Sequence, residues 1–185
     1  KQLIPGGNGL LSKRPERYLP DFWPTYYKKC HGIKVTDLNN NNYLDFSNMA
    51  VGSCILGYSN REVNNFVKKN IDVGNNCTLN SPLEVKLAKK ILNFHPEFQK
   101  VKFAKTGGEA LTIAIRIARA CSKSVNIAFS GYHGWHDWYL ATNLYSSKNL
   151  NEHLLQGLSP LGVPKQLINT ALPVRFNNIK DLRSL

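Results

Sequence analysis

The sequence predicts an α/β protein, in which a small N-terminal β-hairpin lobe precedes the first part of a larger domain built on a mixed, mostly parallel sheet. Three patterns predict this fold. Two alternating extended runs flank a run of asparagines, three Ser/Thr-x-x-Glu motifs mark helix starts, and one stretch has the strand–helix–strand spacing of a βαβ unit. We expect the lobe to cover residues 1–58 and the incomplete larger domain to cover residues 59–185.

The hairpin is predicted around four consecutive asparagines, residues 39–42. Residues 33–36 before them and 43–46 after them alternate between apolar and polar side chains, as half-buried strands do. Asparagine tolerates a positive φ better than most residues, so the run suits a tight turn. An antiparallel ribbon near the N-terminus is the expected result.

Helix starts are predicted where a Ser or Thr is followed three residues later by Glu, the pattern of a capping box. The three motifs are Ser59 with Glu62, Ser81 with Glu84, and Thr106 with Glu109. The third helix, over residues 106–120, is apolar on most sides, so we expect it to be buried against a sheet. Residues 177–185 have the pattern of the first turns of a further amphipathic helix.

The third helix lies between two short extended runs, residues 101–104 and 125–129. This order predicts parallel strands joined by a helix. Ligands of such sheets bind beyond the carboxyl ends of the strands. The segments at those ends, residues 105–108 and 130–134, are both rich in glycine and polar side chains, which makes them the candidate site.

Composition indicates a globular protein, with 42% hydrophobic and 19% charged residues and a length of 185 residues. We expect neither a membrane helix nor a secretory signal, because no apolar window is long enough for a membrane helix and residues 1–7 lack the long apolar core of a signal. Four scattered cysteines without a C-x-x-C pair argue against zinc and for reduced, mostly buried thiols, so we expect a cytoplasmic protein with no membrane partner.

The net charge of +12 raises the question of a nucleic-acid-binding domain. Its lysines come in separate pairs at the solvent positions of predicted helices, such as residues 68–69 and 89–90. We therefore interpret the charge as a solvated basic surface and expect no nucleic acid partner. Strongly salt-dependent binding to DNA or RNA would identify the alternative.

Thr106, Gly107 and Gly108 have the parts of an anion-binding cup. Glycine lets the backbone approach a ligand closely, and a helix start offers free N–H donors in a favourable dipole field. The threonine hydroxyl adds one more donor. The plainer interpretation is that Thr106 only caps the helix and the glycines only form a turn, and local pattern leaves both open.

Residues 131–137, Gly-Tyr-His-Gly-Trp-His-Asp, combine rings and glycines at a predicted strand end, which suits a flat heterocyclic ligand. His133 and His136 have the H-x-x-H spacing of a metal site. Gly134 between them makes a helix there unfavourable and no third ligand is near, so we expect no metal. For three further rings, ordinary packing under a loop is the expectation: Trp135, Trp138 and Tyr139.

These segments together resemble the class III aminotransferases, most of all the glutamate-1-semialdehyde aminomutases and their sugar-pathway relatives. Residues 101–110 and 116–120 are similar to the family's cofactor-phosphate segment, and residues 131–134 to its G-x-Y-H-G segment. The likeness extends from residues 4–7 through 43–45 and 55–58 to 162–165, in the family's order. It covers essentially the whole chain.

The resemblance implies a partial type I fold of the enzymes that depend on pyridoxal 5′-phosphate (PLP), normally a homodimer acting on small amino and keto substrates. By resemblance, Thr106, Gly107 and Gly108 would hold the phosphate of the cofactor. Tyr132 would stack on its pyridine ring and His133 would border it. A lysine attaches the cofactor in this family, and no lysine here follows a matching motif, so no catalytic residue is assigned.

Two departures from the family pattern stand out. The phosphate cup usually reads Ser-Gly-Thr, whereas this chain has threonine first and glycine last. The aminomutases' Ser-Pro-Val-Arg run corresponds here to residues 11–15, Leu-Ser-Lys-Arg-Pro. A substrate other than glutamate semialdehyde is therefore expected.

We interpret the chain as the N-terminal portion of a transaminase or aminomutase, inactive alone. The alternative is a non-catalytic binding or assembly protein that keeps the front half of the fold.

Overall fold

A computed structural model describes residues 2–74, 77–153 and 156–185. Contacts divide the chain into two compact units, Lys1–Pro82 and Leu83–Leu185. The domain boundary that we predict at residue 58 remains a prediction.

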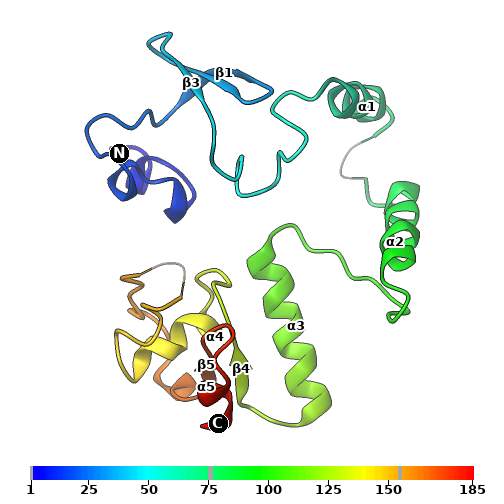
Figure 1. The fold of residues 1–185 in the computed structure, drawn as a ribbon. Coiled ribbons are helices and arrows are strands. Elements are labelled where there is room, and N and C mark those ends of the chain that lie inside the picture. The colour runs from blue at the N-terminus through cyan, green and yellow to red at the C-terminus, as the bar shows by residue number, and fades with distance from the viewer. Residues whose placement is uncertain (1, 75–76, 154–155) are drawn as a thin grey trace. The chain divides into compact units, whose positions relative to one another are not determined.

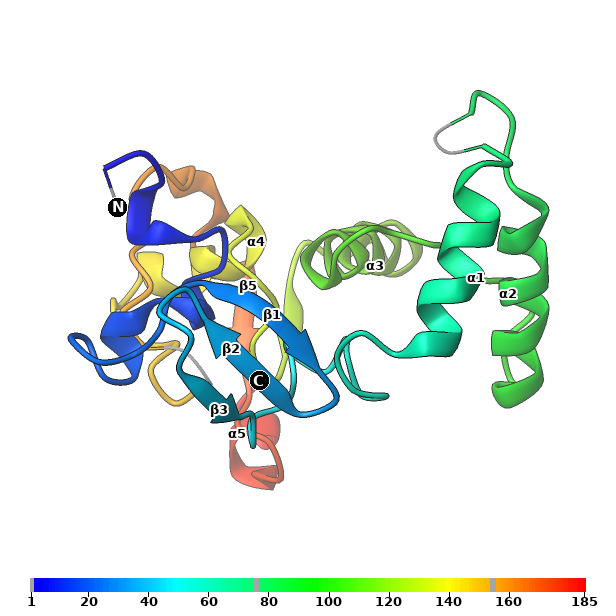
Figure 2. The same cartoon turned by 90° about the horizontal axis from the view of Figure 1, so that it is seen from above.

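The first unit contains a three-stranded antiparallel sheet in the order β1-β2-β3 (Figures 1 and 2). Its strands are β1 (Tyr27–His31), β2 (Lys34–Asp37) and β3 (Asn42–Leu44). The predicted hairpin is confirmed, because β2 pairs with β3 across the asparagine run. Asn40 takes the positive φ, +67°, that the run was expected to allow.

The side chain of Asp37 holds this turn together. Its carboxylate accepts the backbone N–H groups of Asn39 and Asn41 at 2.9 and 2.8 Å. It also accepts the Asn41 amide and the Tyr43 hydroxyl, each at 3.0 Å. The hairpin is thus closed by polar contacts within seven residues of sequence.

Helix α1 (Arg61–Ile71) starts one residue later than the capping motif predicts. Asn60, not Ser59, caps it, and its side chain accepts the N–H groups of Glu62 and Val63 at 3.1 Å each. Ser59 has a φ of +53° and donates its hydroxyl to the Cys30 carbonyl at 2.8 Å. That hydroxyl is engaged with the strand, which leaves the cap to the next residue. Short 3-10 turns lie before the sheet at Pro5–Gly7, Leu11–Lys13 and Pro15–Arg17.

The helices of the second half are α2 (Pro82–Phe94), α3 (Gly107–Ser122), α4 (Asp137–Leu140) and α5 (Ile179–Arg183). The predicted capping box of α3 is confirmed. Thr106 Oγ1 accepts the Glu109 N–H at 3.2 Å, and Glu109 Oε2 accepts the Thr106 N–H at 3.1 Å. The predicted terminal helix also forms, capped by Asn178.

The parallel strand pair does not have the predicted members. Strand β4 (Ile127–Phe129) pairs in parallel with β5 (Ala171–Pro173), more than forty residues away. The prediction of a strand over residues 101–104 is wrong, because in the described chain that run has no regular secondary structure and pairs with no strand. Local spacing indicates an extended run, but only a neighbour makes it a strand.

Helix α3 is more exposed than its composition predicts. No described residue of α3 is buried, and Ile117 is 54% exposed. The expectation that the helix is buried against a sheet is therefore wrong for the residues described. Within the second unit, hydrogen bonds join α3 to its neighbours, such as Trp138 Nε1 to Thr112 Oγ1 at 3.2 Å and Arg119 Nε to the Val125 carbonyl at 2.8 Å.

The apolar core lies in the second unit, around β4, α4 and β5. Its buried apolar residues are Phe129, Trp138, Tyr139, Leu140, Ala141, Leu150, Leu158, Val163 and Ala171. Trp138 and Tyr139 thus pack as expected. Trp135 does not, because it is 76% exposed.

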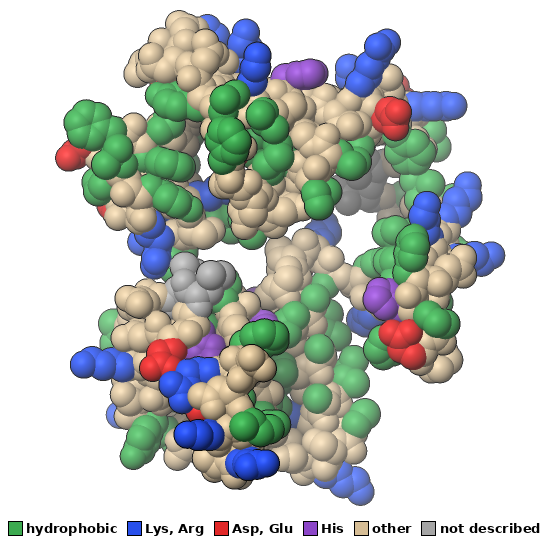
Figure 3. All heavy atoms as spheres, viewed as in Figure 1, with side chains coloured by type: hydrophobic (Ala, Val, Ile, Leu, Met, Phe, Trp, Pro, Cys, Tyr) green, Lys and Arg blue, Asp and Glu red, His purple; other side chains and the backbone are tan. Residues whose placement is uncertain are grey.

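The cysteines and the basic side chains can be compared with the expectations drawn from composition. The four cysteines are free thiols and none is buried: Cys77 and Cys121 are exposed, and Cys30 and Cys54 are partly exposed, so the prediction of mostly buried thiols is wrong. Lysine and arginine side chains are spread over the face seen in Figure 3 rather than gathered in one patch. Within the part of the chain that the structure describes, no helix is both long and apolar enough to span a bilayer.

Candidate functional site

The N-terminus of α3 presents two backbone donors without a partner in the described chain. Glu109 Oε2 accepts the N–H groups of Lys105 and Thr106, each at 3.1 Å. The next two N–H groups, of Gly107 and Gly108, belong to the first helical turn, where no carbonyl of the helix can reach them. They remain available to an anion, in the region where the helix dipole favours negative charge.

The second predicted segment lies directly against this helix start. A side chain at Gly108 would lie 3.9 Å from the His133 carbonyl oxygen, and one at Gly134 would lie 3.4 Å from the Gly108 Cα. Gly134 has a φ of +96°, which only glycine adopts without strain. The structure therefore brings the two glycine-rich segments together, beyond the carboxyl end of β4.

Tyr132 is supported from beneath by Tyr139. The two rings meet edge to face with centroids 5.7 Å apart, and the Tyr132 ring itself is only half-buried. Tyr139 is fully buried and donates its hydroxyl to the Gly131 carbonyl at 3.3 Å. Burial, with the nearby Tyr132 adding to it, raises the pKa of Tyr139 to about 12, so its hydroxyl stays a neutral donor.

His133 is turned toward the aromatic core. Its Nε2 donates to the Ser130 carbonyl at 2.6 Å, and its ring lies 5.9 Å from Phe129 and 6.0 Å from Trp138. His136 lies instead against Gly108, so the two histidines do not converge on one point. No cluster of three metal-binding side chains occurs among the described residues.

His153 fixes the start of the loop, and sequence reasoning missed it. It is 5% exposed, and its Nδ1 accepts the Gly131 N–H at 3.2 Å. Burial lowers its pKa, partly opposed by the charge of Glu152, so neutral imidazole is the form that fits. No local pattern could have found it, because twenty-two residues separate donor and acceptor.

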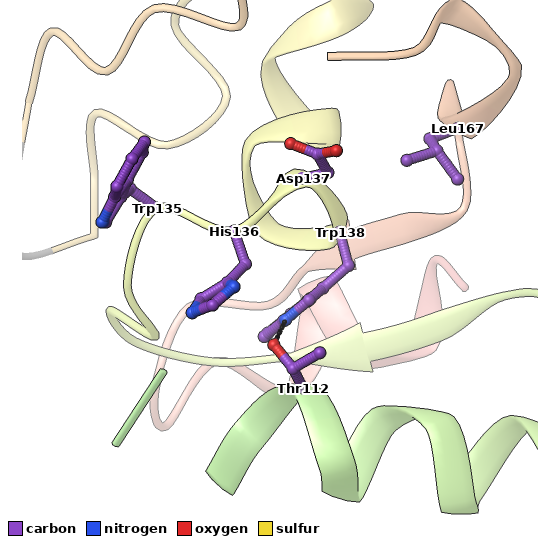
Figure 4. Close-up of a pocket in the computed structure, with 6 residues that line it drawn as sticks. All are labelled: Thr112, Trp135, His136, Asp137, Trp138 and Leu167. Atoms are coloured by element: carbon purple, nitrogen blue, oxygen red, sulfur yellow. Dashed lines mark hydrogen bonds between the residues drawn. The ribbon is translucent and has the colours of Figure 1, made fainter. Parts of the chain in front are cut away.

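A shallow, mainly apolar pocket of about 590 Å³ lies beside these segments (Figure 4). It is lined by Thr112, Trp135, His136, Asp137, Trp138 and Leu167. None of the five residues predicted to bind a cofactor lines it. The pocket therefore adjoins the helix start through His136 and is not itself the anion cup.

The chain is similar to known proteins over nearly its whole length. The model of the family described as aminotransferase class III matches residues 19–174. A 3-aminobutyryl-CoA aminotransferase of Cloacimonas acidaminovorans is 31% identical over all of this chain and 40% of its own length. A glutamate-1-semialdehyde 2,1-aminomutase of Nitrosopumilus maritimus is 35% identical over 99% of this chain and 41% of its own length.

Among solved structures, the FumI protein of Sphingopyxis sp. MTA144, which contains PLP, superposes with a TM-score of 0.78. It is 22% identical, and the match covers 99% of this chain and 40% of that one. This likeness shows the fold, which is the predicted partial type I fold of PLP-dependent transferases. The chain spans about two fifths of the length of the relatives it matches.

Proposed function

The chain belongs to the class III aminotransferase family, whose cofactor is pyridoxal phosphate, and we propose that it supplies the phosphate cup and one ring-facing loop of a transaminase or aminomutase. The observation that carries the proposal is the meeting of the α3 N-terminus with the loop over residues 131–134. This placement unites two segments that sequence reasoning selected separately.

The residues at the α3 N-terminus fit a phosphate group. Gly107 and Gly108 offer free N–H groups, and a side chain at Gly107 would meet no atom within 4 Å, so the space beside Gly107 is open. The Thr106 hydroxyl accepts the Glu109 N–H and keeps its own proton to donate. The Glu109 carboxylate accepts two backbone N–H groups, and these bonds hold the backbone of the cup in place without a ligand.

We assign Tyr132 the face of the pyridine ring and His133 its border. Support comes from two contacts that hold the loop: the Tyr132 ring packs edge to face on Tyr139, and His153 accepts the Gly131 N–H. Offset stacking of two aromatic rings contributes about 0.5–1.5 kcal/mol beyond area burial. In this arrangement Tyr132 would orient the cofactor's ring, and His133 would be held through its bond to Ser130.

Pyridoxal phosphate, when bound, supplies an electron sink that stabilises negative charge developing beside the transferred amino group. The lysine that attaches it, and the acid that pairs with its ring nitrogen, are proposed to lie outside residues 1–185. A homodimer is proposed for the whole enzyme. The chain's own residues bind and orient the cofactor.

The direct test is the intact mass of the full-length protein from its natural source, before and after borohydride reduction. We expect the gain of one phosphopyridoxyl group on a lysine outside residues 1–185. A Thr106→Val variant, which keeps the side-chain shape but loses the hydroxyl, should retain less cofactor after dialysis. A protein that folds yet takes up no cofactor would overturn the proposal and favour the non-catalytic alternative.

A further inference from the structure

The His136 ring fills the space where a side chain at position 108 would lie. A Cβ on Gly108 would be 2.7 Å from His136 Nε2 and 2.9 Å from its Cδ2, closer than Cβ contacts occur in proteins. Figure 4 shows the His136 ring extending from the start of α4 toward α3, beside the indole of Trp138. Glycine at position 108 and histidine at position 136 are therefore a matched pair.

Two features hold the His136 ring in this place. Gly134, with its positive φ, lets the loop approach, since a side chain there would lie 3.5 Å from His136 Cδ2. On the other side, Trp138 Nε1 donates to Thr112 Oγ1 at 3.2 Å, and this hydroxyl donates to the Gly108 carbonyl at 2.9 Å. His136 thus lies between a glycine that approaches the first turn of α3 and a Trp138 side chain that is hydrogen-bonded to the helix.

The imidazole of His136 has no hydrogen-bond partner among the described residues, although it is half-buried. Its Nε2 lies over the first turn of α3, 2.7 Å from where a Cβ on Gly108 would stand. An imidazole N–H in this position is a donor without an acceptor. A phosphate oxygen at the helix start would supply one.

We propose that His136 Nε2–H donates a hydrogen bond to the phosphate of the bound cofactor, replacing the hydroxyl that family members carry at the third position of the cup. This inference rests on the proposed function. By resemblance to the family's Ser-Gly-Thr cup, position 108 would carry a hydroxyl, whereas this chain has glycine there and the imidazole of His136 in the space that a side chain would fill. A hydrogen bond to a charged oxygen is among the stronger kinds.

The test is a titration of the full-length apoprotein with PLP and, separately, with pyridoxal, which lacks the phosphate. His136→Ala should weaken PLP binding about tenfold or more while leaving pyridoxal binding nearly unchanged. Gly108→Thr alone should also weaken PLP binding, because its Cβ displaces the ring. The double variant Gly108→Thr/His136→Ala should recover most of the lost affinity, since it restores a hydroxyl and removes the clash.

Three outcomes separate the possibilities. Selective loss for PLP with rescue in the double variant, and partial retention in His136→Gln, which keeps an N–H donor, supports the inference. Equal weakening of PLP and pyridoxal, or no weakening, overturns it and leaves His136 as a packing residue. A wild-type protein that binds neither compound overturns the proposed function itself.

Discussion

The two contact units are held together by different interactions. The first unit buries almost no apolar side chain among its described residues, and Phe22 and Phe46 are 78% and 87% exposed. Its sheet is closed by hydrogen bonds to Asp37 from residues close in sequence. The second unit contains the nine buried residues of the apolar core, drawn from segments that are far apart in the sequence. Local polar contacts thus specify the hairpin, and long-range packing specifies the candidate site.

Removing the Tyr139 side chain, which lies in the packed core of the second unit, should have the largest effect on the free energy of unfolding. Tyr139→Ala empties a fully buried aromatic position, and such changes cost about 3–5 kcal/mol. Tyr139→Phe keeps the ring and loses only the bond to Gly131, for about 1 kcal/mol. Urea unfolding of the full-length protein measures both. Tyr27→Ala, at an exposed position in β1, is the matched control and should change the free energy of unfolding little.

His153 tests whether one buried hydrogen bond holds the loop. His153→Leu leaves the Gly131 N–H unpaired, which costs about 1–3 kcal/mol. His153→Asn keeps an acceptor near the Nδ1 position and should be milder. A leucine variant as stable as the asparagine variant would show that the bond contributes nothing.

Lowering the pH should reduce stability through protonation of His153. The folded-state pKa of His153 lies below its ordinary 6.5, because burial disfavours the charged ring. Above pH 6.5 the ring is neutral in the folded and the unfolded state, and the protein keeps its full stability. As the pH falls below 6.5 the unfolded state takes up the proton first, so the free energy of unfolding decreases. The urea midpoint should fall between pH 7.5 and pH 5.5 in the wild type, and fall less in His153→Asn. Equal slopes in the two proteins would contradict this assignment.

The hairpin should respond to acid in a lower range. Burial raises the pKa of Asp37, but the hydrogen bonds from Asn41, Tyr43 and Asn39 outweigh it and hold the pKa below 3.8. The stability that this carboxylate contributes is present above that value and is lost as the pH falls through the folded-state pKa. Amide exchange protection at Asn39 and Asn41 should then drop. Asp37→Asn should show weak protection already at neutral pH.

The smallest effect is expected at the surface cluster of Arg175. Its guanidinium contacts Asp181 at two points, each 2.7 Å, and Glu152 at 3.1 Å. Hydrogen bonds from Arg175 lower the pKa of Asp181 to about 2. Arg175→Gln should return that pKa toward 3.8, as followed by carboxyl NMR, with little change in unfolding midpoint at neutral pH because the cluster is solvent-exposed. An unshifted Asp181 would refute the pairing.

Sequence patterns predicted those parts of the fold that neighbouring residues decide. The asparagine turn and the Thr106–Glu109 capping box formed as expected, because each needs partners only a few residues away. The motif at Ser59 failed by one position, since the hydroxyl bonds to Cys30 across the sheet instead. The run at residues 101–104 failed for the same reason, since a parallel strand needs a partner far along the chain.

The sequence by itself determined the family, the hairpin, the helix starts and the two glycine-rich segments that it marks for a cofactor. These features depend on residue type and short spacing, which a single chain displays directly. Only the tertiary structure decided that β4 pairs with β5, that His153 holds Gly131, and that His136 occupies the space beside Gly108. Each of these contacts joins residues at least twenty positions apart, and their meeting depends on how the whole core packs.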